Sequence, residues 1–203
     1  LLEMNTPEEF SNPLERVIAV LDLEWTAWES SHARKWSGPG EEREIIQIGA
    51  VRLQNNEELH ELDSLDVLVK PQANPELSDY IIDLTGITQE RVDAEGMGFP
   101  DALERLVEFL EPKTNAVYSW GTDFQVIKEN CSLNDISFPF QEALFINARE
   151  LLSRTVDKAF NDVISSGLPD AVGFPPSGRA HQGIDDCYCI AETFRILRKQ
   201  GKF

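Results

Sequence analysis

The sequence predicts an α/β domain in which a mixed β-sheet is flanked by α-helices. Two observations carry this prediction: strand-like apolar runs come first along the chain, and segments with helical periodicity, interrupted by one further strand, follow. The chain has 203 residues, of which 41% are hydrophobic, a length that suits one domain and a composition that supplies a core. We therefore expect an acidic lead-in over residues 1–14 and one domain over residues 15–203.

Two apolar runs open the expected domain. Arg16 to Leu23 (RVIAVLDL) and Ile45 to Leu53 (IIQIGAVRL) are rich in β-branched residues and predict neighbouring strands. The polar segment 25–44 between them contains two glycines and a proline and exceeds the usual hairpin loop, so we expect a mobile insertion there. Glu61 to Val69 supplies a third strand, which completes an antiparallel meander before two prolines break the pattern.

A helical repeat begins at Pro100. Apolar residues recur there at positions i, i+3, i+4 and i+7, the spacing of a helix that packs one face on a sheet. These positions are Leu103, Leu106, Val107 and Leu110. The helix is expected to end near Pro112, and Ala116 to Trp120 (AVYSW) is expected to form a short buried strand.

Three further helices are expected. Thr122 or Asp123 is placed to cap a helix that runs through Asn130. The other two run from Asn147 to Ala159 and from Asp185 to Arg198, with a loop rich in glycine and proline between them.

The charge balance limits the function classes. A net charge of −18 repels phosphate backbones and counts against a general nucleic-acid binder. It counts less against an enzyme whose carboxylates form a metal cage, because bound cations reverse the local field. The three cysteines form no CxxC pair, the opening residues lack the basic start and apolar stretch of a signal peptide, and the given sequence contains no apolar run of membrane-spanning length. We expect a soluble, cytoplasmic protein without membrane association.

Asp22 and Glu24 form the first candidate metal site. They stand two residues apart at the end of the first strand, so both carboxylates lie on one face while Leu21 and Leu23 point to the other. Two close carboxylates stay ionised when a cation lies between them or when both are solvated. An isolated pair of this kind is more often a solvated strand end.

Two later aspartates and a histidine complete the constellation. Asp123 follows a strand, where an N-cap is the commoner role, and Asp186 stands at a loop-to-helix junction. Taken with the strand pair, they supply the hard oxygen donors from separate elements that two magnesium or manganese ions need. His181, in a loop beside a glycine, is the candidate proton acceptor near neutral pH. His32 and His60 read as solvated surface residues.

Three motifs in this order resemble those of the DEDDh 3′-to-5′ exonucleases, which have a ribonuclease-H-like fold. They are LDLEWT (Leu21 to Thr26), SWGTDF (Ser119 to Phe124) and HQGIDD (His181 to Asp186). The resemblance covers most of the chain. The segment LSDYIIDLTGITQERVD (Leu77 to Asp93) and the loop GRAHQGIDD are similar to the enhanced-RNAi branch and its KapD-like bacterial relatives, which places RNA ahead of DNA as substrate.

The resemblance implies a phosphodiester hydrolase that removes nucleoside 5′-monophosphates from a single-stranded 3′ end. It implies that Asp22, Glu24, Asp123 and Asp186 bind two Mg²⁺ ions, which Mn²⁺ can replace, and that His181 is the general base. The same five residues are the candidates that residue type and position in the chain indicate.

The resemblance also implies that the LTGIT segment lines the pocket of the 3′-terminal nucleotide, with the terminal hydroxyl near the backbone that follows Glu24. The candidate substrate-binding residues are Trp25, Thr26, Leu84, Gly86, Ile87 and Trp120. Without the family, an ordinary turn with packed leucine and isoleucine explains LTGIT equally well.

The chain departs from the family in two ways. The insertion carries Trp28, His32, Arg34, Lys35 and Trp36, which suit stacking on single-stranded substrate, although packing of the tryptophans on the domain is the preferred interpretation. We expect no accessory nucleic-acid-binding domain, so substrate choice is expected to depend on a protein partner or on the active site alone. Two rival functions are a non-catalytic exonuclease-fold binding module and a phosphoesterase for small esters.

Overall fold

A five-stranded mixed sheet forms the centre of the protein. The computed structural model describes residues 16–111 and 114–203, so the expected lead-in and Pro112 lie outside the described residues. The strands are β1 (Val17–Trp25), β2 (Ile45–Gln54), β3 (Glu61–Leu68), β4 (Thr114–Ser119) and β5 (Phe145–Asn147). The sheet order is β3-β2-β1-β4-β5, with β1 to β3 antiparallel and β4 and β5 parallel to β1. The predicted meander and the mixed sheet are confirmed.

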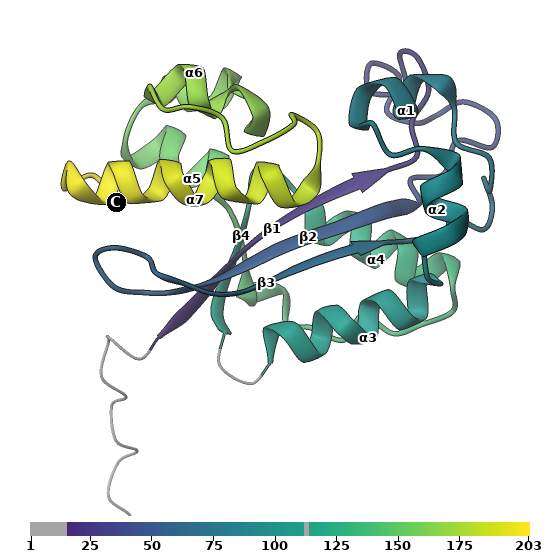
Figure 1. The fold of residues 1–203 in the computed structure, drawn as a ribbon, viewed down its shortest axis with the longest axis horizontal. Coiled ribbons are helices and arrows are strands. Elements are labelled where there is room, and N and C mark those ends of the chain that lie inside the picture. The colour runs from purple at the N-terminus through teal and green to yellow at the C-terminus, as the bar shows by residue number, and fades with distance from the viewer. Residues whose placement is uncertain (1–15, 112–113) are drawn as a thin grey trace, which may run out of the picture.

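Helices cover both faces of this sheet (Figure 1). The helices are α1 (Asp79–Thr85), α2 (Gln89–Glu95), α3 (Phe99–Leu110), α4 (Asp123–Leu133), α5 (Ala148–Thr155), α6 (Leu168–Val172) and α7 (Gly183–Lys199). In Figure 1, α3 and α4 lie on one face, α5, α6 and α7 lie on the other, and α1 and α2 lie beside the end of the sheet where β1 finishes. Among the described residues, none of the helices combines the length and the apolar character needed to cross a membrane.

Strand β1 divides its side chains between two cores. Leu21 and Leu23 belong to the cluster packed with α3 and α4, whereas Ile18 and Val20 belong to the cluster packed with α7. Because successive side chains of a strand point to opposite faces, Asp22 and Glu24 are directed toward the face that α7 covers. The predicted partition of this strand is therefore confirmed.

Several short elements differ from the prediction. The segment that follows the proline break after β3, where no helix is predicted, contains α1 and α2, and the expected loop before the last helix contains α6. The hydroxyl of Ser78 caps α1 by accepting from the Ile81 N–H at 3.2 Å, and Gly86 ends it with a left-handed φ of 72°. The helix predicted over 147–159 ends at Thr155 and gives way to a 3₁₀ turn.

The segment between β1 and β2 folds back on the domain. Trp36 Nε1 donates to the Thr26 carbonyl at 3.0 Å, and Arg34 pairs with Glu41. At the end of the segment, the buried Glu44 carboxylate accepts backbone N–H groups from residues 72–74. Trp36 thus packs on the domain, the preferred interpretation for the tryptophans of this insertion, while one side of it lines the cavity described next.

Candidate active site

The four acidic residues and the histidine line one cavity of about 430 Å³. Asp22 and Glu24 come from β1, Asp123 from the start of α4, Asp186 from the first turn of α7, and His181 from the loop that precedes α7. All four carboxylate residues are buried. Residues that are far apart in the sequence are thereby brought to one place, beside the N-terminal end of α7 (Figure 1).

Two glycines bring α7 against the sheet at this point. A side chain at Gly49 of β2 would overlap the main-chain carbon of Gly183, and one at Gly183 would lie 3.0 Å from the Asp22 carbonyl oxygen. The Gly183 N–H donates to Gln47 Oε1 at 2.9 Å. The close approach sets the first turn of α7, and Asp186 with it, beside β1.

Asp123 connects the second motif to the first. The N-cap position of α4 is Thr122, whose side chain makes no capping hydrogen bond. The Asp123 carboxylate instead turns toward β1, where its Oδ1 accepts from the Leu23 N–H at 3.3 Å. The aspartate is therefore the first residue of the helix and not its cap.

Burial raises the pKa values of all four carboxylates, and neighbouring carboxylates raise some of them further. Burial, followed by the charges of Asp123, Glu24 and Asp186, raises the pKa of Asp22 well above its usual value. Burial, followed by the charges of Asp186 and Asp123, raises the pKa of Glu24 to about 8. Burial raises the pKa values of Asp123 and Asp186 to about 6. The protein's own groups leave this cluster short of positive charge.

The donor set fits divalent cations. Ligand atoms of Glu24, His181 and Asp186 lie within 4.8 Å of one another. Asp186 Oδ2 accepts from Ser165 Oγ at 3.3 Å, but Oδ1 is buried and has no hydrogen-bond partner in residues 16–111 and 114–203. A buried, unsatisfied carboxylate oxygen requires a partner, and hard oxygen donors suit Mg²⁺ or Mn²⁺.

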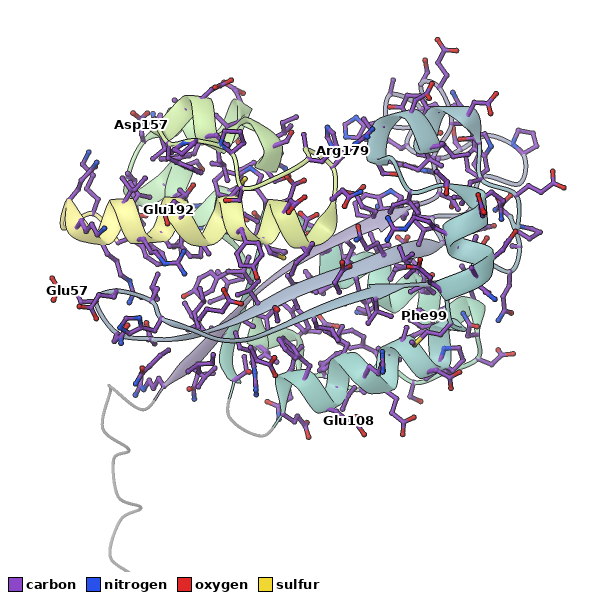
Figure 2. The ribbon with its side chains drawn as sticks, viewed as in Figure 1. Glu57, Phe99, Glu108, Asp157, Arg179 and Glu192 are labelled. Carbon is purple, nitrogen blue, oxygen red and sulfur yellow. The ribbon has the colours of Figure 1, made fainter. Side chains whose placement is uncertain are left out.

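The loop that carries His181 is fastened to α1. His181 has a left-handed φ of 61°, uncommon for a non-glycine residue. Arg179 donates to the Asp83 carbonyl oxygen at 3.1 Å, and Gln182 donates to the Thr85 carbonyl oxygen at 3.1 Å. Figure 2 shows Arg179 between the start of α7 and α1. Burial lowers the pKa of His181, which favours the neutral, proton-accepting imidazole.

The six candidate substrate-binding residues divide into two groups. Trp25, Leu84 and Trp120 line the cavity. The other three are not among its lining residues: Thr26 donates to the Glu42 carbonyl oxygen at 2.6 Å, Ile87 is fully buried, and Gly86 ends α1.

Sequence reasoning missed part of the cavity wall. The additional lining residues include Arg43, Tyr80, Ile81, Arg149, Ile164 and Ser165. Tyr80 and Ile81 lie in α1, a helix whose seven residues are too few to show a clear repeat. Its cap residues are the signal that locates it.

The sequence is similar to those of known exonucleases. Residues 19–194 match the family model RNase_T, described as Exonuclease. The chain is 28% identical over 190 residues to the probable 3′-5′ exonuclease KapD of Bacillus subtilis, covering 92% of this chain and 86% of that protein. It is 28% identical over 200 residues to human 3′-5′ exoribonuclease 1, covering 95% of this chain and 55% of that protein, so it spans about half of the human relative.

A solved structure shares the whole fold. The nuclease domain of 3′hExo, a DEDDh family member bound to rAMP, aligns with a TM-score of 0.78 at 26% identity. The alignment covers 93% of this chain and 94% of the other. The ribonuclease-H-like fold predicted from the motifs is confirmed.

Proposed function

The chain belongs to the DEDDh 3′-5′ exonuclease family, and from that premise we propose that it is a divalent-metal-dependent exonuclease of single-stranded nucleic acid. It shortens RNA in preference to DNA and releases nucleoside 5′-monophosphates. The convergence of four buried carboxylates and one imidazole on a single cavity carries this proposal. Two findings support RNA as the preferred substrate: the human relative is named an exoribonuclease, and the solved neighbour is bound to rAMP.

Each of the four acids and His181 is assigned a role in hydrolysis. Asp22, Glu24, Asp123 and Asp186 would hold two Mg²⁺ ions, which supply water activation and stabilise the leaving 3′ oxygen. His181 accepts the proton of the water whose oxygen attacks phosphorus. The bond from phosphorus to the 3′ oxygen of the penultimate nucleotide breaks, so the terminal nucleotide leaves as a 5′-monophosphate.

The cavity wall on the α1 side receives the terminal nucleoside. Trp25 and Leu84 present apolar surface there, and Tyr80 adds an aromatic ring that is 40% exposed. Aromatic and aliphatic walls bind any base through its face, which suits an enzyme that must accept each nucleotide in turn.

A paired digestion tests the proposal. Single-stranded RNA and DNA of the same sequence, labelled at the 5′ end, are incubated with Mg²⁺, with Mn²⁺ or with EDTA. We expect stepwise shortening from the 3′ end and nucleoside 5′-monophosphates in either metal, faster on RNA, and no product in EDTA. The Asp186→Asn variant, which keeps the side-chain shape, is expected to be inactive, and undiminished activity in EDTA would contradict the metal requirement.

Two further assays separate the rival functions. A non-catalytic binding module retains the oligonucleotide in a filter assay and releases no nucleotide. A phosphoesterase for small esters hydrolyses p-nitrophenyl phosphate and leaves the oligonucleotide at full length.

A further inference from the structure

The cavity extends beyond the side that receives the terminal nucleoside. The α1 residues that line it are aromatic or aliphatic, and the acids come from β1 and from the starts of α4 and α7. The opposite wall consists of Arg149 from the first turn of α5 together with Ile164 and Ser165 from the segment before α6. In Figure 1, α1 stands on one side of the start of α7, and α5 and α6 stand on the other.

Arg149 differs from the second arginine of the cavity, Arg43. The Arg43 guanidinium pairs with Glu129 and lies over the rings of Trp25 and Trp36 at 5.9 and 5.5 Å. Arg149 is partly buried and makes no hydrogen bond or ion pair with any residue in the described ranges. A guanidinium that lines a cavity without a protein partner is available to an anion.

Two further observations place that anion next to the reacting groups. Arg149 and Asp123 line the same cavity, so an anion held by the guanidinium lies in the space that the acids surround. Ile164, 55% exposed, adds apolar surface to the same wall. A cation beside an apolar surface suits a phosphate and the sugar or base attached to it.

We propose that Arg149 binds the phosphate on the 5′ side of the penultimate nucleotide, one step upstream of the bond that is cut. This inference rests on the proposed function, which places the terminal nucleoside on the α1 side and the scissile phosphate at the acids. The rest of the strand must then leave across the wall that contains Arg149. In a protein with a net charge of −18, one unpaired arginine at this point supplies the local attraction that the surface as a whole opposes.

Two dinucleotides that differ by one phosphate test the assignment. NpN contains the scissile phosphate alone, and pNpN carries in addition the 5′ phosphate that Arg149 is proposed to bind. We expect wild-type protein to hydrolyse pNpN with the higher kcat/KM. Arg149→Gln should lower kcat/KM on pNpN by about tenfold or more, the scale of a charge-assisted contact, mainly through KM. Its rate on NpN should stay within about twofold of wild type, well below that scale.

Two variants serve as controls. Arg149→Lys keeps the charge without the two-pronged guanidinium and should fall between wild type and Arg149→Gln on pNpN. Arg105→Gln removes an exposed arginine from α3 on the other face of the sheet, so it reports the effect of net charge alone and should leave both rates unchanged. Circular dichroism and thermal unfolding verify that each variant is folded.

The outcomes are distinct. An equal loss on both dinucleotides would show that Arg149 acts on the scissile phosphate or on Asp123, and an unchanged rate on pNpN would show that it binds no phosphate. Either result overturns the assignment. Wild-type protein that cleaves neither dinucleotides nor longer strands in Mg²⁺ would instead refute the proposed function.

Discussion

His181 is the residue whose role is most open to direct measurement. Its imidazole lies within 4.8 Å of carboxylate oxygens of Glu24 and Asp186, and burial lowers its pKa. We expect His181→Ala to lower kcat by about a hundredfold or more, the usual contribution of a general base, while Mn²⁺ binding measured by calorimetry is largely kept. The matched control is His60→Ala, because His60 is an exposed histidine that contacts Glu58. Wild-type turnover in His181→Ala would remove the imidazole from the reaction.

Glu24 predicts a pH dependence of stability. Its pKa is raised from 4.5 to about 8 in the folded protein, so between these values the folded state binds more protons than the unfolded state. The free energy of unfolding of the metal-free protein therefore falls as pH rises through that window. Glu24→Gln removes the buried charge and should be more stable than wild type in EDTA at pH 8, by on the order of 2 kcal/mol, with the difference vanishing toward pH 5.

Thermal unfolding with and without metal provides the check. Excess Mg²⁺ should reverse the order of the two proteins, because the ion stabilises the folded form that retains all four ligands. Glu108→Gln, at an exposed carboxylate of α3 that points away from the core (Figure 2), is the control and should follow wild type. A Glu24→Gln protein that is less stable than wild type in EDTA at pH 8 would show that the buried charge of Glu24 does not destabilise the metal-free protein.

At the scale of elements, the contact between β2 and α7 decides whether the site assembles. Since a Cβ at Gly49 would overlap the backbone of Gly183, Gly49→Ala must push the start of α7 away from the sheet. We expect a loss of about 1–3 kcal/mol or more in the free energy of unfolding and a loss of turnover, since Asp186 moves with the helix. At Gly167 the nearest atom to a new Cβ is 3.5 Å away, so Gly167→Ala should change neither quantity. Wild-type stability and turnover in Gly49→Ala would show that the close approach is not required.

Some elements could be predicted from sequence and others could not, for reasons of length. Strand β1 and helix α3 carry enough residues for a repeat of two or of 3.6 to be visible. Helices α1, α2 and α6 have five to seven residues, and their ends depend on capping residues such as Ser78 and Thr88. Strand β5 has three residues and is defined by its pairing with β4, which no local pattern indicates.

At the scale of the whole molecule, the acidic residues could be picked out because each stands within a motif, near the end or the start of an element. Asp22 and Glu24 follow from strand periodicity, and Asp123 and Asp186 from strand-to-helix and loop-to-helix junctions. The unpaired state of Arg149 was not predictable. In sequence it is an ordinary helix residue, and its place in the cavity depends on how β5 and α5 are set beside β4.

The hydrogen bonds between the His181 loop and α1 allow the side chains of α1 to vary without displacing His181. Arg179 and Gln182 bind main-chain carbonyl oxygens at Asp83 and Thr85, and so do not depend on which side chains α1 presents to a nucleotide. Under the proposed function, exposed positions of that helix, such as Tyr80, are therefore free to diverge toward other terminal bases without loosening His181, the proposed proton acceptor. Selectivity can drift during evolution while the rate of bond cleavage is preserved.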